Sequence, residues 1–370
     1  MRPNAILPRV LALTFLASIG AAVTWNGIYY VARDLFGYDK RDNLVLATLL
    51  GLVYTIGAIS SKPVTNALRS FTARAFGKPI STRDQIVANL ILGGLASFIP
   101  MALPTEFGLW LFGIISVPLL GLLWPAVETY VSSGQRGKNL NRAIGLWNIT
   151  WATAIIPGMW AMGWLMKSNP ALVIPAIAPL MFAALIPVLM LPAEPGAHGE
   201  AAHEHTPEQD ATYRKILRRF RVCLVASYVL SSALAAVIPM ILENRLSVPK
   251  QWQTPLQSVW MISRLVTFAA LMAWQGWHGR QGLSFVAGGL LLAGFGIAIA
   301  ATAPAMLAVG LSVLGIGLGL TYVAAIYYAL EVGTTDVDAG ARHEAAIGLG
   351  YTLGPLLYLL VMLATETLAG

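Results

Sequence analysis

The sequence predicts an all-α polytopic membrane protein made of two pseudo-symmetric helical bundles, and three observations support this prediction. Of the 370 residues, 57% are hydrophobic and only 11% are charged, whereas a soluble domain carries about 25% charged residues. The apolar residues form long runs, which can cross a bilayer as helices because a helix satisfies its own backbone hydrogen bonds. In addition, one stretch of sequence occurs twice, about half a chain apart.

The repeated stretch links two apolar helices through a short polar loop. The first copy occupies residues 121–134 and 142–151, and the second occupies 319–333 and 342–351. Each copy has aromatic residues and a carboxylate in its first helix, a turn ending in Gly, and a second helix that opens on Arg and reaches Ala-Ile-Gly-Leu. Glycine- and alanine-rich spans also resemble each other by composition alone, but here the loop and its flanks repeat together. Two similar halves are typical of secondary transporters.

Composition and motifs exclude several other classes of protein. The single cysteine, Cys223, cannot form an intrachain disulfide, and no Cys/His spacing is typical of zinc. The net charge of +7 lies in the loops, where it orients the spans, so it does not indicate a nucleic-acid partner. The sequence has neither a phosphate-binding Gly-x-x-x-x-Gly-Lys-Ser/Thr loop nor a His-x-x-x-His or Gly-x-Ser-x-Gly site. We therefore expect no enzymatic activity, no cofactor and no metal site.

Eleven apolar runs are the expected spans, six before and five after a polar segment. We expect residues 1–191 to form a six-helix bundle, residues 192–221 a cytoplasmic linker, and residues 222–370 the second bundle. The linker is predicted from its Glu, His and Pro content and a basic cluster. The expected spans are 10–31, 44–60, 86–103, 107–131, 143–166, 171–191, 222–242, 256–274, 283–301, 306–330 and 345–363.

The basic residues predict the orientation of these spans. With the N-terminus inside, the inner segments hold 17 of the 24 Lys and Arg residues, the outer segments hold six, and Arg264 lies within a span. An excess of positive charge marks the cytoplasmic side. We therefore expect a multi-pass protein of the cytoplasmic (inner) membrane, with the N-terminus and the linker inside and, after eleven spans, the C-terminus outside.

Six spans, a polar linker and a second, related set of spans resemble the major facilitator superfamily over nearly the whole chain. The family's loop between spans 2 and 3 usually carries a Gly-x-x-x-Asp-Arg-x-Gly-Arg type of motif. Here the region reads Gly57-Ala-Ile-Ser-Ser-Lys-Pro and then Arg74-Ala-Phe-Gly-Lys78, so glycines and basic residues remain but the Asp is missing. The motif's usual gating contact is therefore not expected in the same form.

Two further features bear on this resemblance. Antiporters of the family often have a Gly-Pro motif in span 5, whereas this chain has Pro157-Gly158 there and Gly354-Pro355 in span 11. The family expects twelve spans, giving six in the second bundle, and the sequence yields five. A naturally short protein, a truncated sequence and a lost helix all account for that difference. The resemblance implies a substrate site between two bundles that rock about it.

Two charged residues inside spans are the first functional candidates, because such residues cost about 2.5–3.5 kcal/mol to insert and face protein or water. Arg264 falls near the middle of span 8, where it fits an anion contact, a partner for a titrating acid, or a structural ion pair. Glu128 follows Trp124 by one helical turn. The resemblance places span 4 at the central cavity, where Glu128 is a candidate proton carrier. The alternative is an ion pair with Arg136 or Arg142.

Three other groups of polar residues favour structural interpretations. Glu331 is expected at the membrane interface. Glu344, next to His343, is expected at the N-terminus of span 11, where a carboxylate suits the helix dipole. The linker residues His198, His203 and His205 are expected to be solvated and disordered rather than to bind a metal.

Aromatic and amide residues within the spans complete the candidate substrate and ion pathway. Aromatic residues near span ends commonly anchor a helix at the membrane interface, whereas an amide inside a span needs a partner within the protein. A cavity lined by aromatic rings suits an amphipathic or cationic organic molecule. These candidates are Asn26 and Tyr29 in span 1, Asn148 and Trp151 in span 5, and Tyr322 and Tyr327 in span 10.

Together these features predict a secondary active transporter of a small organic molecule, working by alternating access and coupled to protons. Sodium coupling would need several oxygen ligands around broken backbone, and no span has such a cluster. We expect a monomer surrounded by membrane lipids. The alternative is a non-transporting membrane sensor or partner subunit of the same architecture, which the missing twelfth span and the altered loop motif favour.

Overall fold

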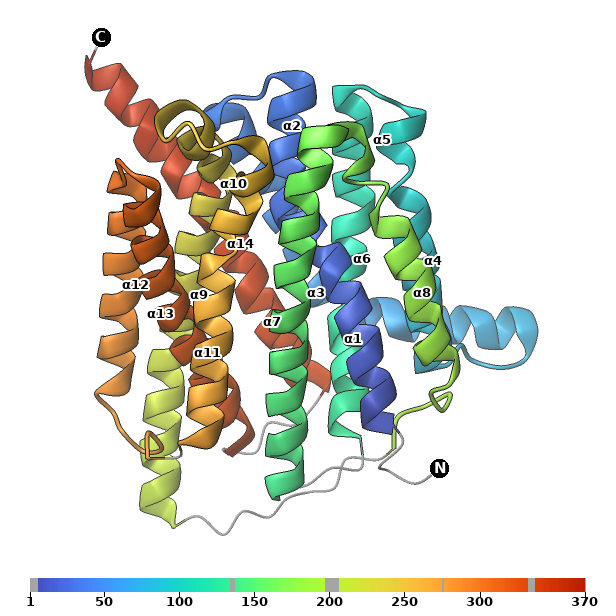
Figure 1. Ribbon diagram of the computed structural model, residues 1–370. Coiled ribbons are helices and arrows are strands. Elements are labelled where there is room, and N and C mark those ends of the chain that lie inside the picture. Colours follow the sequence, from blue (N-terminus) through green and yellow to red (C-terminus); the bar gives the residue numbers. More distant parts are fainter. Residues whose placement is uncertain (1–5, 134–136, 197–205, 275, 332–336, 370) are drawn as a thin grey trace.

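A computed structural model describes residues 6–133, 137–196, 206–274, 276–331 and 337–369. In this part of the chain, eleven helices are long and apolar enough to cross a membrane. The eleven spans expected from the apolar runs are therefore confirmed, and so is the all-helical fold class. Figure 1 shows most of these helices running along one common axis.

The first half of the chain provides six spans. Span 1 is continuous through a π-helical turn, and span 3 ends in a short extra helix. The elements in order are α1 (Ile6–Ala22), η2 (Val23–Gly27), α2 (Ile28–Phe36), α3 (Lys40–Phe76), α4 (Thr82–Ala96), α5 (Ile99–Ala102), α6 (Glu106–Ser132), α7 (Gly137–Ser168), η3 (Pro170–Leu172) and α8 (Ile177–Leu189).

The second half provides five spans. Its first span also contains a π-helical turn, and its second is broken between two helices. The elements are α9 (Pro207–Met240), η4 (Ile241–Arg245), α10 (Lys250–Gln257), α11 (Val259–Ala273), α12 (Leu283–Ala300), α13 (Pro304–Glu331) and α14 (Val337–Ala369).

Most helices begin a few residues before the predicted spans, and α9 and α14 begin earliest relative to the prediction. Helix α9 starts at Pro207, inside the expected linker 192–221, because Thr206 caps it in a capping box with Gln209. Helix α14 starts at Val337 rather than near residue 345. The expectation that Glu344 marks a helix N-terminus is therefore wrong, since that residue lies well inside α14.

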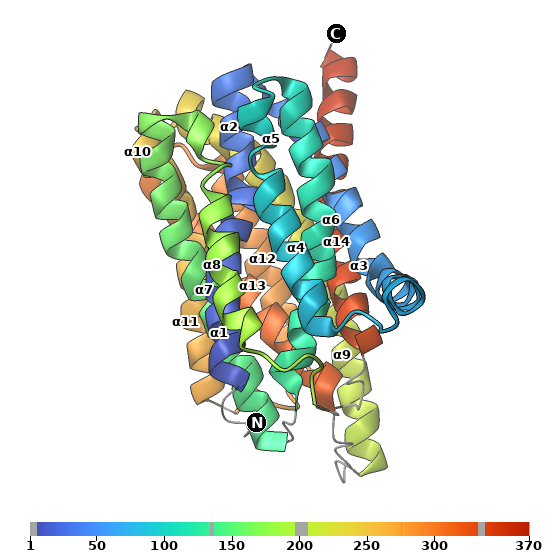
Figure 2. The same cartoon turned by 90° about the vertical axis from the view of Figure 1, so that its right-hand side faces the viewer.

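The bundle has two ends, which we name after Figure 1. The lower end is where α1 begins, and the upper end is where α2 ends and α14 finishes, near the C-terminus (Figure 1). Helix α3 runs past the predicted span 44–60 through Pro63 and turns sideways, away from the bundle axis (Figures 1 and 2). A proline removes one helical hydrogen bond and permits such a change of direction.

Small residues allow α14 to pack between α3 of the first half and α9 of the second. A Cβ added at Gly51 of α3 would lie 2.4 Å from the backbone nitrogen of Thr352, and one added at Gly348 would lie 2.6 Å from Oγ1 of Thr55. Close backbone approach through glycine is the usual way in which helices pack in membranes. This crossing brings side chains of the two halves together at the centre of the molecule.

Candidate functional site

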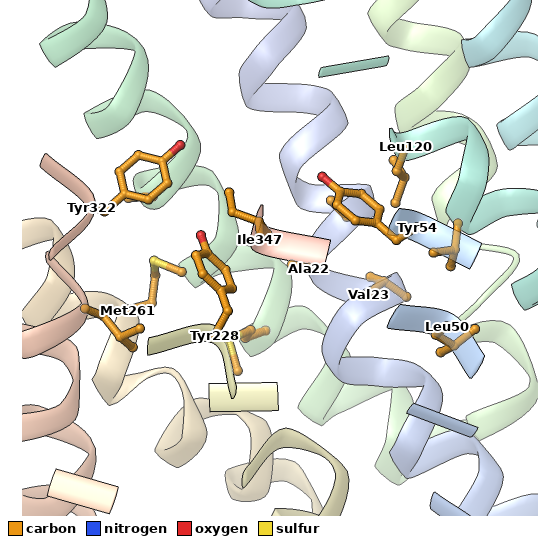
Figure 3. Packing of buried hydrophobic residues seen from close by; sticks show 14 of the residues in the cluster. Ala22, Val23, Leu50, Tyr54, Leu120, Tyr228, Met261, Tyr322 and Ile347 are labelled. Carbon is orange, nitrogen blue, oxygen red and sulfur yellow. The ribbon is translucent and has the colours of Figure 1, made fainter. Parts of the chain in front are cut away.

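The candidate site lies at the junction of the two halves, halfway along the bundle. Figure 3 shows Tyr54 of α3, Tyr228 of α9 and Tyr322 of α13 gathered around Ile347 of α14. All three tyrosines are buried, with 3%, 6% and 3% of their surface exposed. Because polar groups are costly within a membrane, such a concentration makes this region the candidate functional site.

Arg264 of α11 is the cation of this site. It is 2% exposed, as its midspan position predicts. Its Nη2 donates a hydrogen bond to the hydroxyl of Tyr228 at 3.2 Å, while its Nε has no hydrogen-bond partner. No carboxylate of the described residues forms an ion pair with it. The guanidinium group is thus buried with most of its donors unused.

Aromatic rings surround this guanidinium on several sides. Its Cζ lies 4.7 Å from the ring centres of both Trp151 and Tyr322, 5.4 Å from Phe268 and 5.8 Å from Tyr228. Trp151, Phe268 and Tyr322 also contact one another, with centroid distances of 5.5–5.9 Å. We call Arg264 with these four rings the arginine box. Trp151 comes from the first half of the chain and the other residues from the second.

A second group of rings adjoins the arginine box through Tyr228. Trp25 of η2 stacks on Tyr351 of α14, with the ring centres 4.1 Å apart and the planes 8° from parallel. Tyr54 packs edge-on against both rings, and Tyr228 packs edge-on against Tyr351 at 5.1 Å. The aromatic contacts thus continue across the junction from one half of the molecule to the other.

Two carboxyl groups lie beside these rings, one from each half. Glu344 of α14 is 5% exposed and accepts a hydrogen bond from the hydroxyl of Tyr54. The carboxyl of Glu128 on α6 faces α14, since a Cβ added at Gly340 would lie 2.5 Å from its Oε2. The two carboxyl groups are close enough to interact electrostatically. We call Glu128 and Glu344 the carboxyl pair.

The alternative role of Glu128, an ion pair with Arg136 or Arg142, is tested only for Arg142. Arg136 lies outside the described residues. Arg142, which is described, is exposed and forms no ion pair with Glu128. Within the described part of the chain, no cation lies within ion-pair distance of either member of the carboxyl pair.

The structure brings several of the sequence candidates to this site. Arg264, Trp151 and Tyr322 belong to the arginine box, and Glu128 belongs to the carboxyl pair. Asn148 is 3% exposed and accepts a hydrogen bond from Nε1 of Trp151 at 3.0 Å, which fixes the orientation of that ring.

The remaining candidates belong to neither the arginine box nor the carboxyl pair. Asn26 and Tyr29 are buried, and Oδ1 of Asn26 accepts a hydrogen bond from Gln257 of the second half at 3.1 Å. Tyr327 stacks on His278 at 4.1 Å, in an aromatic group outside the arginine box. Trp124 is half-buried against the core and makes no ring contact with either group of rings just described.

Sequence reasoning missed several residues of the site as candidates. Tyr351 ends the second copy of the repeated stretch, where Trp151 ends the first, so the repeat contained that signal. Glu344 was assigned to a helix end because α14 begins earlier than its apolar run. Tyr54 and Tyr228 carried no local signal, because a tyrosine within a span looks the same whether it faces lipid or protein.

Charged residues also join the two halves at the upper end. Arg33 Nε and Asp34 Oδ1 are 2.6 Å apart, and Lys250 Nζ lies 2.8 Å from the other oxygen of Asp34. Arg33 also donates to the Pro239 carbonyl at 2.8 Å and lies 3.7 Å from Glu243. We call these contacts the upper lock, because they tie α2 to α9, η4 and α10.

The described residues contain no group of three His, Cys, Asp or Glu side chains that could hold a metal ion. The linker histidines His198, His203 and His205 lie outside the described residues.

Solved structures of transporters share this arrangement of helices. A nucleoside transporter, NupG, matches with a TM-score of 0.66 and 16% identity, over 96% of this chain and 90% of its own. A POT family transporter in complex with a thioalcohol-conjugated peptide matches with a TM-score of 0.71 and 11% identity, over the same shares. The chain has the major facilitator fold.

A bacterial homologue of the human lysosomal transporter Spinster also matches, with a TM-score of 0.61 and 12% identity over 95% of this chain and 81% of that one. No family model and no curated protein matches the sequence. The fold expected from the resemblance is confirmed, and the chain is a multi-pass membrane protein. At these identities, the likeness establishes the fold alone.

Proposed function

We propose that this protein is a secondary active transporter that carries a small organic molecule across the cytoplasmic membrane by alternating access, coupled to protons. The moving bodies are the two bundles, residues 1–191 and 222–370, joined by the cytoplasmic linker 192–221, of which residues 207–221 form the start of α9. The lower end faces the cytoplasm and the upper end faces outward, as the distribution of basic residues indicates.

The observation that carries this proposal is the carboxyl pair. Glu128 and Glu344 come from different bundles and both lie beside the junction, and no cation of the described residues is within ion-pair distance of either. Two nearby carboxylates repel each other, and one proton bound by the pair relieves that repulsion. Because rocking of the bundles changes the separation of the pair, it also changes how tightly the proton is held. This is the link that proton coupling requires.

The other features of the molecule fit this cycle. Polar residues at mid-depth between two related bundles are the usual substrate site of such folds. The upper lock joins the bundles on one side only, so it acts as the outer gate, which opens when the bundles rock. Similarity to transporters of nucleosides and peptides supports transport as the class of activity.

The partners follow from the same reading. The substrate is a small molecule, H⁺ is the coupling ion, and no nucleic acid, cofactor or enzymatic step is involved. Membrane lipids cover the large apolar side chains exposed around the spans, such as Ile59, Leu92 and Val266. We expect the monomer to be the working unit, because each monomer contains both bundles and a complete junction.

The test is transport by the purified protein in liposomes. Radiolabelled uridine, dialanine and benzoate are offered as probes, with and without an imposed pH gradient, and empty liposomes serve as the control. We expect at least one probe to accumulate above its equilibrium level only with the gradient, and a protonophore to abolish that accumulation. Binding of a probe without any movement would contradict the proposal and favour the non-transporting sensor.

A further inference from the structure

Arg264 is the buried charged residue whose missing contacts point most directly to a ligand in the described part of the molecule. The residue is 2% exposed, yet only one hydrogen bond of 3.2 Å serves its five donors, and its Nε has no partner. An ionised group buried without a counter-charge costs several kcal/mol. A protein retains such a residue when something else completes its contacts.

The surrounding rings compensate for only part of that cost. A cation–π contact contributes about 0.5–2 kcal/mol and acts on the face of the guanidinium. Trp151 and Tyr322 lie close enough for such contacts, both at 4.7 Å. The N–H groups, however, point outward in the guanidinium plane, where a carboxylate binds them through two parallel hydrogen bonds. The unused part of Arg264 therefore matches a carboxylate.

The balance of charges at the site also favours an anionic ligand. When the carboxyl pair binds protons, Arg264 remains a buried positive charge with no counter-ion among the described residues. An anion bound at Arg264 would restore neutrality, so proton and anion favour each other's binding. The titratable and charged groups around this site, grouped by helix, are Tyr29 on α2, Tyr54 on α3, Glu128 on α6, Tyr228 and Arg221 on α9, Arg264 on α11, Tyr322 on α13, and His343, Glu344 and Tyr351 on α14.

The rings set the shape of the rest of the ligand. Trp151, Phe268 and Tyr322 belong to the arginine box, and Trp25 and Tyr351 stack next to it. Aromatic pairs prefer edge-to-face and offset contacts with a flat partner. Because Arg264 already occupies the ring faces as a cation, a second cation would be repelled there.

We infer that the transported molecule is a planar organic anion, whose carboxylate binds Arg264 while its ring packs among the aromatic residues of the junction. This inference rests on the proposed transport function and specifies its substrate class. In this proposal Arg264 contacts the substrate directly.

The experiment measures binding to the full-length protein purified in detergent, by tryptophan fluorescence and by thermal stabilisation. The probes are three matched pairs, each an aromatic carboxylate and its neutral amide: benzoate and benzamide, nicotinate and nicotinamide, and indole-3-acetate and indole-3-acetamide. Benzylamine serves as the cation. We expect at least one carboxylate to bind at least about tenfold more tightly than its amide, since hydrogen bonds to charged groups contribute about 1.5–3 kcal/mol.

Variants then assign the effect to Arg264. We expect Arg264→Gln to abolish the preference for the carboxylate, and Arg264→Lys to keep part of it. Arg280→Gln is the matched control, because Arg280 also lies over a tryptophan ring, at 5.4 Å from Trp274, but is exposed. That variant should bind like the unmodified protein.

Two results would overturn the inference. One is the finding that no carboxylate in the panel binds better than its amide. This comparison uses only the unmodified protein, so it is decisive even if Arg264→Gln fails to fold. The other is a folded Arg264→Gln protein that keeps the full preference. Gradient-driven transport of uridine without carboxylate binding would overturn this inference and leave the proposed function standing. Carboxylate binding without transport of any probe would overturn the proposed function, and with it the role of the anion as a transported substrate, and would leave only an anion-binding site at Arg264.

Discussion

In the described part of the chain, the charged residues of the upper lock are paired with opposite charges, whereas those at the centre of the molecule are not. In the upper lock, Asp34 contacts both Arg33 and Lys250, at 2.6 and 2.8 Å, and every charge has an opposite charge beside it. At the centre, Arg264 has no carboxylate and the carboxyl pair has no cation within ion-pair distance among the described residues.

The proposed transport cycle accounts for this difference. A charge that already has an opposite charge beside it holds two surfaces together and needs no charged ligand. An unpaired buried charge is unfavourable until a proton or a counter-ion arrives. We therefore assign the upper lock to gating and the centre to binding.

The largest expected effect comes from removing the charge of the carboxyl pair. Glu344→Gln and Glu128→Gln should each abolish accumulation driven by a pH gradient, because an amide cannot carry the proton. Exchange of substrate across the membrane should remain in both variants. Liposome transport assays measure the two activities separately.

The matched control for these variants is Glu106→Gln at the upper end. Glu106 also accepts a hydrogen bond from a tyrosine, Tyr38, at 3.1 Å, but it is exposed. This variant should accumulate substrate normally. Normal accumulation and pH dependence in both central variants would instead show that the carboxyl pair carries no proton.

A tight crossing of α3 and α14 lies beside the centre and aligns Tyr54 with Glu344. Gly51→Ala places a methyl group 2.4 Å from the backbone of Thr352, and overpacking of this kind costs about 1–3 kcal/mol. The melting temperature of the purified protein should fall. In Gly93→Ala, where the added methyl meets open space, it should stay nearly unchanged, and equal melting of the two variants would argue against a close α3–α14 crossing.

Breaking the upper lock should open the gate without affecting binding. Asp34→Asn removes a carboxylate whose side chain is 4% exposed, and we expect it to weaken the closed state by about 2 kcal/mol. The readout is labelling of Ser258→Cys, a buried position, by an impermeant maleimide added outside, in a Cys223→Ala background. The labelling rate should rise by about tenfold or more.

Asp39→Asn is the control for that variant. Asp39 is also at the upper end but caps its own helix α3, a role that Asn fills equally well. Its labelling rate should not change. Slow labelling in Asp34→Asn as well would mean that the upper lock does not close the gate.

The smallest effect is expected for Lys250→Ala. Its side chain is 44% exposed, and an exposed ion pair contributes about 0–1 kcal/mol. The same labelling rate should therefore change by less than about fivefold. A change as large as that of Asp34→Asn would show that the exposed pair matters as much as the buried Arg33–Asp34 contact.

The fold was largely predictable from the sequence, whereas the site was predictable only in part. Long apolar runs locate the spans, because a helix must be long enough to cross the bilayer and must satisfy its own backbone hydrogen bonds there. The loop charges then predict the orientation of the spans. Arg264, Trp151 and Glu128 stood out because a charge inside a span, or a repeated position, is visible locally.

The missed residues depend on rotation and register. Tyr54 and Tyr228 belong to the site only because of the faces that α3, α9 and α14 present to one another. The composition of a span does not reveal which of its faces is buried. Glu344 was misplaced because its helix starts with polar residues, so the apolar run marked the membrane and not the helix. The capping box of Thr206 was readable in the sequence but lay within a stretch interpreted as linker.

The most direct test of the central claim is proton uptake on substrate binding. Purified protein in a weakly buffered solution is titrated with the tightest-binding aromatic carboxylate, and a pH indicator reports the protons taken up. If the unpaired charges at the centre bind proton and anion together, about one proton should be taken up for each anion bound, and Glu344→Gln should reduce that number. Binding of the carboxylate with no proton uptake at any pH between 5 and 8 would contradict the account.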